Sequence, residues 1–582
     1  MSKRARPKTP PPAVVTTVPI WRRWPTALVM ILLVAAVLRF VGLGQYGPPG
    51  LNQDEASNAW NAYCLLKTGQ DQAGVRWPIF YSRCLGANRS TLHLYILLPF
   101  QAIGGLNVWT TRAPSALGGV LTVLLTYVVG SRLFGRKAGL VAAAMLAVNP
   151  WHLQQSRWGH EAALCTLLVM APFAVLLWAN LAFDGGPDDK RRTRIWAAGL
   201  GGVLTGVCCY GYPAVRVFLP AFLVLAAAVT WRGWWHRLKT RNGALGIGAL
   251  AIGVAVTFGP LAWQHLTDRD KTGIAKRSKT TMVWKPDDSF GQKVSAALGR
   301  YPGHFGLDFL FVNGDGYEIQ SVPEFGQFHW YMLPMMIVGL IVVLRRVWSS
   351  WPARVLLVWM LTYPISDCLT SHFKGSMHAL RASPGMTSLI FLAAVGLATV
   401  GHWLWKRQRA MALALGGLLA VIVIALNARF LHTFFGAYNE RERVYYLGYH
   451  VDLLEACEWL RPRLDEVDAV FVTTRMTNMP YVITLVKLGY DPNQWFTDVK
   501  TVRTTREFDN YARYGKMNFM YGRVLGHPER SVLNELKANG RPDRGLLIIR
   551  PGELGDFGGR KPDHEIVGSR GRSSLWIYRV TM

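Results

Sequence analysis

Cysteine is scarce in this chain, with seven residues among 582. The cysteines are scattered, and none of their spacings is typical of a zinc site. Cys64 and Cys84 fall in one predicted loop, where a disulfide is an open alternative if the compartment is oxidising. Cys208 and Cys209 fall inside an apolar segment. The cysteines therefore give no reason to expect a structural zinc ion.

Patterns that bind nucleotides or direct cleavage are also missing. No GxGxxG or P-loop sequence opens a helix in residues 431–582, so we assign no nucleotide to that region. The N-terminal tail is long and rich in proline, and no small-residue cleavage site follows the first apolar run. We therefore expect an uncleaved N-terminus.

Long apolar segments dominate what is present. Hydrophobic residues make up 51% of the chain, and its mean hydropathy is +0.17. Apolar segments of about 17–25 residues are typical of transmembrane helices. The sequence predicts about eleven of them, near 25–43, 112–131, 138–153, 162–182, 195–211, 214–231, 244–263, 329–344, 354–369, 384–401 and 410–428. The alternative, a large soluble enzyme, is disfavoured because its core helices are shorter and have polar faces.

Acidic residues are few, with 35 Asp and Glu against 64 Lys and Arg, a net charge of +29. Such a chain often binds nucleic acid, but here the position of the charge decides the interpretation. The basic residues gather beside alternate predicted spans, within 3–23, 132–137, 190–194, 232–241, 345–354 and 406–409. With eleven spans, all six clusters fall on one face, which predicts a cytoplasmic N-terminus. Their expected partner is anionic membrane lipid, and no nucleic acid is expected.

Two long loops are predicted on the outer face, at 44–111 and 264–328. Within the first, the apolar segment 92–105 is only about 14 residues long, a length that favours a re-entrant or surface helix. Counting it as a span would place the later basic clusters outside. We therefore expect it to lie at the outer surface. Loops this long usually carry function or are disordered.

The composition divides the chain into three parts. Residues 1–24 form a basic cytoplasmic tail, 25–430 a helical membrane domain, and 431–582 a small α/β domain outside the membrane. Residues 449–464 have helical spacing, and 469–474, 545–550 and 574–579 are typical of strands. The last domain is expected to cover the mouth of a membrane site or to serve assembly.

Several segments occur in an order that matches a known family. They are GLNQDEA, the stretch from TTRAPSALGG to AGLVAA, NPWHLQQSRWGHEAAL, and GDGYEIQSVPEFGQFHWYMLPMMIVGL. Over residues 25–430 the chain resembles the GT-C glycosyltransferases that use polyprenyl-phosphate-linked sugars. This group includes the protein O-mannosyltransferases (glycosyltransferase 39-like) and the lipid A aminoarabinose transferase. The resemblance implies the α-helical polytopic GT-C fold and inverting sugar transfer outside the cytoplasmic membrane.

Two acidic elements correspond to the family's acidic motifs. Asp54 is the candidate general base, because an acceptor hydroxyl is a poor nucleophile without a carboxylate within reach. Glu55 is expected to orient it or to bind acceptor or metal. Glu161 is a second catalytic candidate, with His160 beside it. The alternatives are purely structural, with Asp54 capping a helix and Glu161 favouring a helix dipole.

The leaving polyprenyl phosphate requires cations, and arginine can bind two of its oxygens. The candidates for the phosphate are Arg89, Arg157, Arg216, His378 and Arg381. For each, the alternative is a charge that snorkels at the membrane interface. Arg216 and Arg381 are favoured because they are exceptions to the positive-inside bias.

Metal binding is left open by the sequence. A divalent cation is possible because relatives differ in their need for one, but no cofactor is assigned. His304 and His329 flank Asp308, Asp315 and Glu318 in the second outer loop without clear metal-ligand spacing.

The sequence therefore predicts a membrane glycosyltransferase whose acceptor is a glycan, a lipid or a protein. A lipid or polysaccharide transporter is the alternative from another class, although the internal repeats expected of many transporters are not visible. A polysaccharide polymerase or ligase is a chemically closer alternative. The sequence names neither the sugar nor the acceptor.

Overall fold

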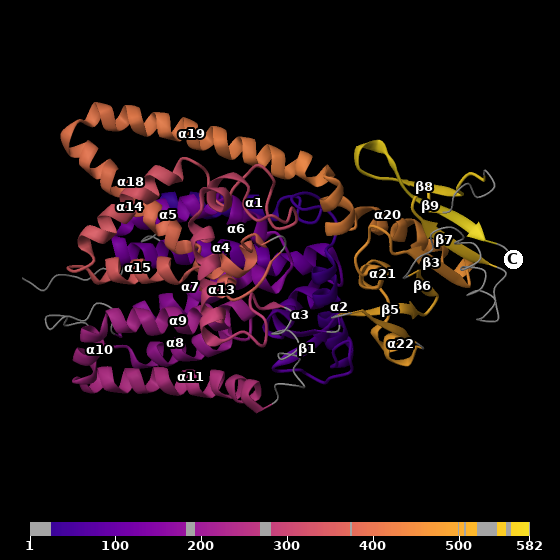
Figure 1. Cartoon of the computed structure of the whole chain (residues 1–582), viewed down its shortest axis with the longest axis horizontal. Helices are drawn as coiled ribbons and strands as arrows, with labels where there is room; N and C mark the ends of the chain where they lie inside the picture. The colour runs from indigo at the N-terminus through magenta and orange to yellow at the C-terminus, as the bar shows by residue number, and fades with distance from the viewer. Residues whose placement is uncertain are drawn as a thin grey trace, which may run out of the picture.

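The structure, a computed structural model, describes residues 25–85, 87–181, 192–267, 281–372, 375–498, 500–505, 508–520, 544–553 and 560–580. Long helices form one part and a β-sheet forms the other, side by side along the longest axis (Figure 1).

Each predicted span falls on a helix. These helices are α1 (Thr26–Phe40), α4 (Val108–Phe134), α5 (Arg136–Ala147), α7 (Cys165–Trp178), α8 (Ile195–Cys208), α9 (Pro213–Val229), α11 (Arg241–Thr267), α14 (Met332–Arg346), α15 (Trp351–Thr362), α18 (Thr387–Arg407) and α19 (Arg409–Phe435). In the described part of the chain, five helical segments are long and apolar enough to cross a membrane alone. A sixth is counted if α9 and α10 (Trp231–Leu238), bent by 78°, form one span. The chain is thus a multi-pass membrane protein, while eleven crossings stay a prediction.

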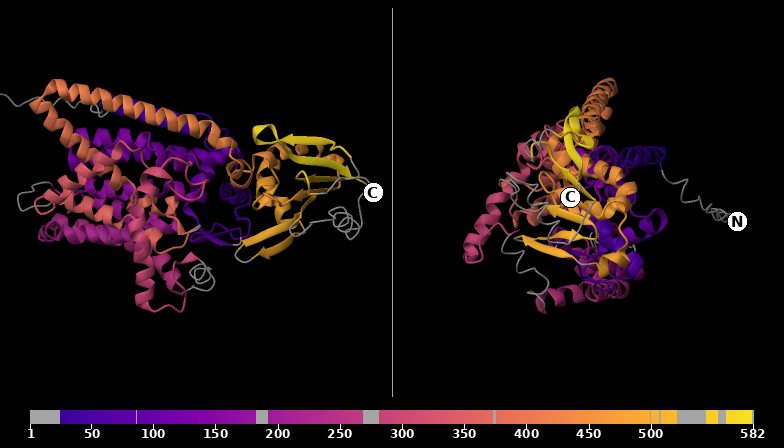
Figure 2. Two further views of the ribbon diagram at one scale, coloured as in Figure 1. Left: turned by 45° about the horizontal axis from the view of Figure 1, so that its top comes forward. Right: turned by 90° about the vertical axis from the view of Figure 1, so that its right-hand side faces the viewer.

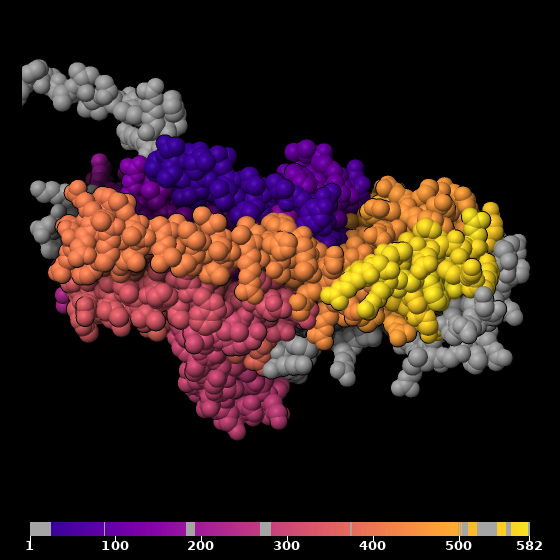
Figure 3. All heavy atoms as spheres, turned by 90° about the horizontal axis from the view of Figure 1, so that it is seen from above, coloured from indigo at the N-terminus to yellow at the C-terminus, as the bar shows by residue number. Residues whose placement is uncertain are grey.

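The outer surface of the bundle suits a lipid environment. In α19, the side chains of Leu413, Val421 and Ile424 are each more than 60% exposed. Figure 3 shows this helix, in orange, lying along one face of the molecule. Apolar side chains this exposed along a whole helix are unfavourable in water but not in lipid. The exposed face of α19 is therefore a lipid-facing surface.

Shorter elements gather where the bundle meets the sheet. α2 (Gln53–Thr68), the hairpin of β1 (Tyr81–Cys84) and β2 (Ala87–Ser90), and α3 (Leu92–Gly104) lie there (Figures 1 and 2). The segment 92–105 is thus a helix of 13 residues as expected, and its depth in a membrane stays a prediction. The remaining short helices before the sheet are α6 (Pro150–Ser156), η2 (Glu161–Leu164), α13 (Phe290–Arg300), η3 (Tyr301–Phe305), η4 (Asp308–Val312), α16 (Ile365–Cys368), α17 (Ala379–Ala382), η6 (Ser383–Gly385), η7 (Ala437–Glu440) and η8 (Arg443–Gly448).

The C-terminal domain is built on a seven-stranded sheet with strand order β4-β5-β6-β3-β7-β9-β8. β3 pairs in parallel with β6 and β7, and the other neighbours are antiparallel. Its strands are β3 (Ala469–Thr473), β4 (Thr501–Thr505), β5 (Phe508–Tyr514), β6 (Met517–Met520), β7 (Gly545–Ile549), β8 (His564–Val567) and β9 (Ser573–Val580). Its helices are α20 (Val451–Leu460), η9 (Arg461–Glu466), α21 (Pro480–Leu488), α22 (Pro492–Thr497) and η10 (Ser569–Gly571). The strands predicted within 469–474, 545–550 and 574–579 are present.

The C-terminal domain and α2 share one hydrophobic core. Ala56, Ala59 and Trp60 of α2 are fully buried in the same cluster as residues of α20, α21 and the sheet. The Trp60 ring meets Trp495 edge to face at 5.9 Å. Burial of apolar area is the main favourable term in such packing. The domain therefore covers one side of the helix that carries Asp54.

The alternative of a disulfide between Cys64 and Cys84 is wrong. Both cysteines are free and fully buried. Cys64 lies in the core that α2 shares with the C-terminal domain, whereas Cys84 lies near Ser57 and Ser82. Burial raises the pKa of the Cys84 thiol to about 12, which disfavours the reactive thiolate.

Candidate active site

The first turn of α2 fixes the two acids of the sequence motif. The side-chain oxygen of Asn52 accepts a hydrogen bond from the Asp54 N–H at 2.9 Å. Glu55 Oε2 in turn accepts one from the Asn52 N–H at 2.9 Å. This capping box satisfies backbone donors that a helix start leaves unpaired. It directs Asp54 and Glu55, neighbours in sequence, toward different surroundings.

Glu55 is fully buried in a two-pronged ion pair. Arg112 Nε lies 2.8 Å from Oε1, and Arg112 Nη2 lies 2.8 Å from Oε2. The Gly159 N–H also donates to Oε1 at 2.5 Å. Arg112 continues to the carbonyl oxygens of Pro48 and Gly50 at 2.8 and 2.9 Å. Glu55 thus joins the first loop to α4 and to the turn before η2, which fits orienting Asp54 better than touching a substrate.

Asp54 is the most accessible of the three predicted catalytic acids. Its side chain is 24% exposed, against 0% for Glu55 and 7% for Glu161. Asp54 Oδ1 is ion-paired with Arg89, and Oδ2 lies 3.8 Å from His160 Nε2. The ion pair restrains the carboxylate while leaving part of it accessible.

Glu161, at the start of η2, completes the cluster. Its Oε1 lies 3.5 Å from Arg89 Nη1, and its Oε2 accepts a hydrogen bond from Asn58 Nδ2 at 2.8 Å. His160 Nδ1 lies 3.6 Å from Oε2. Asp54, Arg89, His160 and Glu161 thus form one charged group, which we call the acid cluster. The two acidic elements of the sequence therefore meet at Arg89 in the structure.

Arg89 lies between the two carboxylates, not on an open surface. Burial lowers the pKa of its guanidinium, but Asp54 and Glu161 raise it by more, so that the pKa is raised overall. Arg89 therefore stays charged. Among the residues that the structure describes, its buried Nε atom has no hydrogen-bond partner. The guanidinium contacts both Asp54 and Glu161, so each of these carboxylates already has a cationic partner.

Arg216 lies next to the acid cluster. It donates to Ser90 Oγ, one residue beyond Arg89, and to the Cys209 carbonyl oxygen at 2.7 Å. Its Nη1 lies 3.4 Å from both Tyr81 Oη and His265 Nε2. Three elements distant in sequence therefore meet at this cation.

The prediction that Arg157 binds phosphate is wrong. Arg157 is fully buried, and it donates hydrogen bonds to five backbone carbonyl oxygens, those of Leu38, Val41, Gly42, Tyr46 and Gly47. Its guanidinium also lies over the Phe435 ring at 4.9 Å. These carbonyls lie at the end of α1 and in the loop after it. The five hydrogen bonds use all five N–H donors of the guanidinium, and none is left for a phosphate.

His378 and Arg381 belong to a separate group. Arg381 donates to Thr370 Oγ1 at 2.7 Å and to the Ser371 carbonyl oxygen at 2.8 Å. His378 stacks on His372 and approaches Asp315. The structure does not pair either residue with the acid cluster, and their binding of phosphate stays a prediction.

The other ionisable residues that were named in the second outer loop lie apart from one another, each in its own surroundings. His304 contacts Asp367 at 2.9 Å, and His329 contacts Asn427 at 3.1 Å. Glu318 lies 3.5 Å from Arg441, and Asp308 is exposed. These four do not converge on one site, whereas Asp315 does join a cluster of its own.

Sequence reasoning missed Arg112, Asn58, Tyr81 and His265. One signal was available for Arg112, because it opens an apolar span at the predicted outer face, as Arg216 does. Asn58 lies four residues after Asp54 on α2, which places the two side chains on one helix face. Tyr81 and His265 gave no comparable signal, since only the fold brings the hairpin to the end of α11.

Comparisons with known sequences match part of this chain to mannosyltransferases. Residues 88–263 match the family model described as dolichyl-phosphate-mannose-protein mannosyltransferase. "Putative mannosyltransferase YycA" of Bacillus subtilis is 24% identical over 249 residues, which span 42% of this chain and 33% of that protein.

The fold is similar to solved structures over nearly its whole length. ArnT from Cupriavidus metallidurans bound to undecaprenyl phosphate superposes with a TM-score of 0.55 at 14% identity, covering 94% of this chain and 97% of that one. The same protein in the apo state gives 0.51 at 14% identity, covering 95% and 97%. At this identity the likeness establishes the fold.

Proposed function

We propose that this chain, which has the GT-C fold, is a membrane glycosyltransferase that moves a sugar from a polyprenyl-phosphate donor to an acceptor hydroxyl. The observation that carries the proposal is Asp54, a partly exposed carboxylate restrained by Arg89 at the edge of a buried charged cluster. Perturbed or paired charges gathered in this way are typical of active sites. The match of residues 88–263 to a mannosyltransferase family model supports the reaction class.

In the proposed reaction, Asp54 is the general base. It takes the proton of the acceptor hydroxyl as the acceptor oxygen attacks the anomeric carbon. The bond between that carbon and the phosphate oxygen breaks in the same step, through an oxocarbenium-like transition state. A single displacement inverts the configuration at the anomeric carbon. Glu161 and Arg89 keep the base in place, and Glu55 holds the loop that carries it.

Arg216 is the proposed ligand of the leaving phosphate. Negative charge develops on the phosphate oxygens as the sugar departs, and a preorganised cation stabilises that charge. Arg216 is held by Ser90 and the Cys209 carbonyl, beside Tyr81 and His265. Arg216 contacts Ser90, and Ser90 follows Arg89, the partner of Asp54. This chain of contacts supports a phosphate position close to the proposed base.

The proposed orientation places the acid cluster outside the cytoplasmic membrane. α10 and the connection from α18 to α19, which carry basic clusters, lie at the end of the bundle away from the sheet (Figure 1). The positive-inside rule assigns that end to the cytoplasm. α2 and the C-terminal domain then face outward, and the donor is reached from the outer leaflet.

The donor class is tested with purified protein in vesicles. Radiolabelled polyprenyl-phosphate mannose is the first donor, because the matching family is described by that sugar, and polyprenyl-phosphate aminoarabinose is the second. We expect label to move to an extractable glycan, lipid or protein acceptor, against vesicles without the protein as control. If neither donor gives transfer while labelled lipid crosses the vesicle membrane, the protein is a transporter and the proposal fails.

Changing Arg89 tests whether it restrains the base. We expect Arg89→Ala to lower transfer by about 10²–10³-fold, the loss that follows removal of one preorganised hydrogen-bond donor in other enzymes. Arg89→Lys retains the charge but loses the planar fork, so about a tenfold loss is expected. Arg83→Ala, at an exposed position on the same hairpin, is the control and should leave transfer unchanged. Equal transfer by the two Arg89 variants and the wild type would exclude this role.

A further inference from the structure

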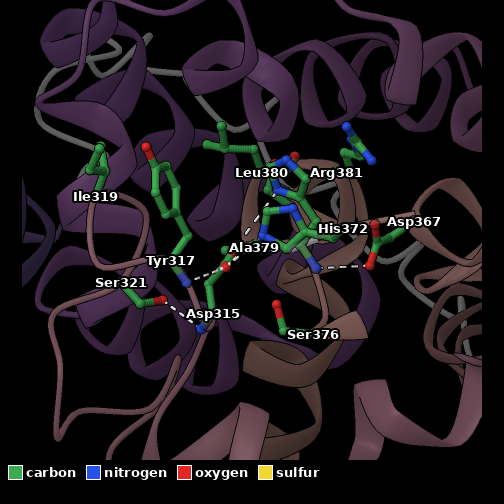
Figure 4. Close-up of polar contacts among 12 residues, drawn as sticks. Asp315, Tyr317, Ile319, Ser321, Asp367, His372, Ser376, Ala379, Leu380 and Arg381 are labelled. Carbon is green, nitrogen blue, oxygen red and sulfur yellow. Dashed lines mark hydrogen bonds and ion pairs between the residues drawn. The ribbon is translucent and has the colours of Figure 1, made fainter. Parts of the chain in front are cut away.

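A second polar cluster lies beside the acid cluster and takes no part in the proposed reaction. Asp315, His372 and His378 each present one atom that can bind a metal, and these atoms lie within 4.8 Å of one another. Asp315 follows η4, and the two histidines lie between α16 and α17. Figure 4 shows the Asp315 carboxylate and the His372 ring turned toward each other. We call these three residues the histidine cluster.

The distances within the histidine cluster suit a small cation. His372 Nε2 lies 2.8 Å from Asp315 Oδ1, and His378 Nδ1 lies 3.7 Å from Asp315 Oδ2. Neighbouring ligand atoms in a tetrahedral zinc site are about 3.3–3.4 Å apart, since each bond is about 2.0–2.1 Å long. The two observed distances lie on either side of that value. All three ligand atoms lie within 4.8 Å of one another, and side-chain adjustment toward this spacing would let them share one ion.

One ligand atom has no partner in the described residues. His378 Nδ1 is buried and makes no hydrogen bond, although the residue is only 6% exposed. Buried polar atoms are nearly always paired, and an exception calls for an explanation such as an ion. The atom faces the Asp315 carboxylate at a distance too long for a hydrogen bond. A cation bound between the two groups would supply the missing partner.

The ligands are held in place by a second layer of hydrogen bonds. The N–H groups of Tyr317 and Ala379 donate to Asp315 at 2.9 and 2.8 Å. The His378 N–H donates to Asp367 Oδ2 at 2.8 Å. Asp367 is itself paired with His304 at 2.9 Å and Arg300 at 3.3 Å, so its charge is compensated. Outer partners of this kind orient metal ligands.

We propose that Asp315, His372 and His378 bind one divalent transition-metal ion of the zinc class, leaving a fourth position for water. Two imidazole nitrogens and one carboxylate oxygen favour such an ion over magnesium or calcium. The ion joins the second outer loop to the segment before α18. It does so close to the acid cluster, since α17 packs against η2. The proposal does not depend on the sugar transfer reaction.

The test is metal binding by the untagged full-length protein in detergent. After chelation, incubation with ZnSO₄ and removal of free metal, we expect about one equivalent of zinc per chain by mass spectrometry. His378→Ala and Asp315→Asn should each weaken zinc binding by at least about 100-fold, since even loss of outer partners costs 10–100-fold. His402→Ala, which removes an exposed histidine of α18, is the control and should bind as the wild type does.

Thermal melting shows in one measurement whether each variant is folded and whether zinc stabilises it. Zinc should raise the melting temperature of the wild type and of His402→Ala, because a ligand that binds the folded state stabilises it. Zinc should leave the melting temperature of His372→Ala unchanged. Zinc bound equally by the wild type and by a variant lacking all three side chains would overturn the proposal. So would a wild type that holds no zinc after chelation and reloading.

Discussion

Replacing Asp54 with asparagine is expected to lower sugar transfer by about 10²–10⁴-fold, the usual contribution of a general base. Asparagine has nearly the same shape but cannot accept the proton of the acceptor hydroxyl. The capping bond of Asn52 goes to the backbone N–H of residue 54, so it survives the change. Arg89 keeps Glu161 as a partner. The variant should therefore insert and melt as the wild type does.

The measurement is initial-rate transfer from saturating labelled donor, together with thermal melting in detergent. Asp308→Asn, which changes an exposed acid of the second outer loop, is the matched control and should keep full activity. A donor-binding assay separates the roles further, because a lost base should leave donor affinity unchanged. Transfer within about twofold of the wild type would remove Asp54 from the proposed mechanism.

Replacing Glu55 with alanine is expected to lower the stability of the fold, whereas the Asp54 variant is expected to fold normally and lose transfer. Arg112 is fully buried and would lose both of its carboxylate contacts. Removing one partner of a buried ion pair costs about 3–5 kcal/mol, because the other charge stays buried without compensation. The Gly159 N–H and the Asn52 N–H would lose their acceptor as well. Little folded protein should reach the membrane.

The measurement is the yield of monodisperse protein and its melting temperature. Glu55→Gln is the informative companion, because it retains the shape and an acceptor oxygen while removing the charge. It should melt between the wild type and Glu55→Ala, with the transfer rate per folded molecule within about tenfold of the wild type. A fully folded Glu55→Ala protein without any transfer would show that Glu55 takes part in the reaction itself.

Much of the architecture follows from local sequence patterns. Each apolar segment predicted as a span falls on a helix, because apolar length and intrahelical hydrogen bonding are local properties. The three predicted strands of the C-terminal domain are present for the same reason. The number of crossings is harder to predict, since several helices, such as α1 and α8, are too short to span alone.

The site was predictable only in part. Asp54 and Glu161 are recognisable from their motifs, and the structure places both beside Arg89. Arg157 was predicted to bind phosphate but binds backbone carbonyl oxygens, because the sequence does not distinguish these two roles of an arginine. The five carbonyl oxygens that Arg157 binds lie more than 100 residues away from it in the sequence. Only the folded chain brings them together.

The sequence by itself determined that this is a helical membrane protein, with an acidic pair after its first apolar run and a basic bias on the other face. Hydrophobic length and charge position suffice for that. Only the tertiary structure decided which of the two acids, Asp54 or Glu55, is buried and which is accessible. The capping box turns Glu55 inward to Arg112 and leaves Asp54 accessible beside Arg89. The physical reason is that burial and pairing of a charge depend on which distant segments the fold packs against it.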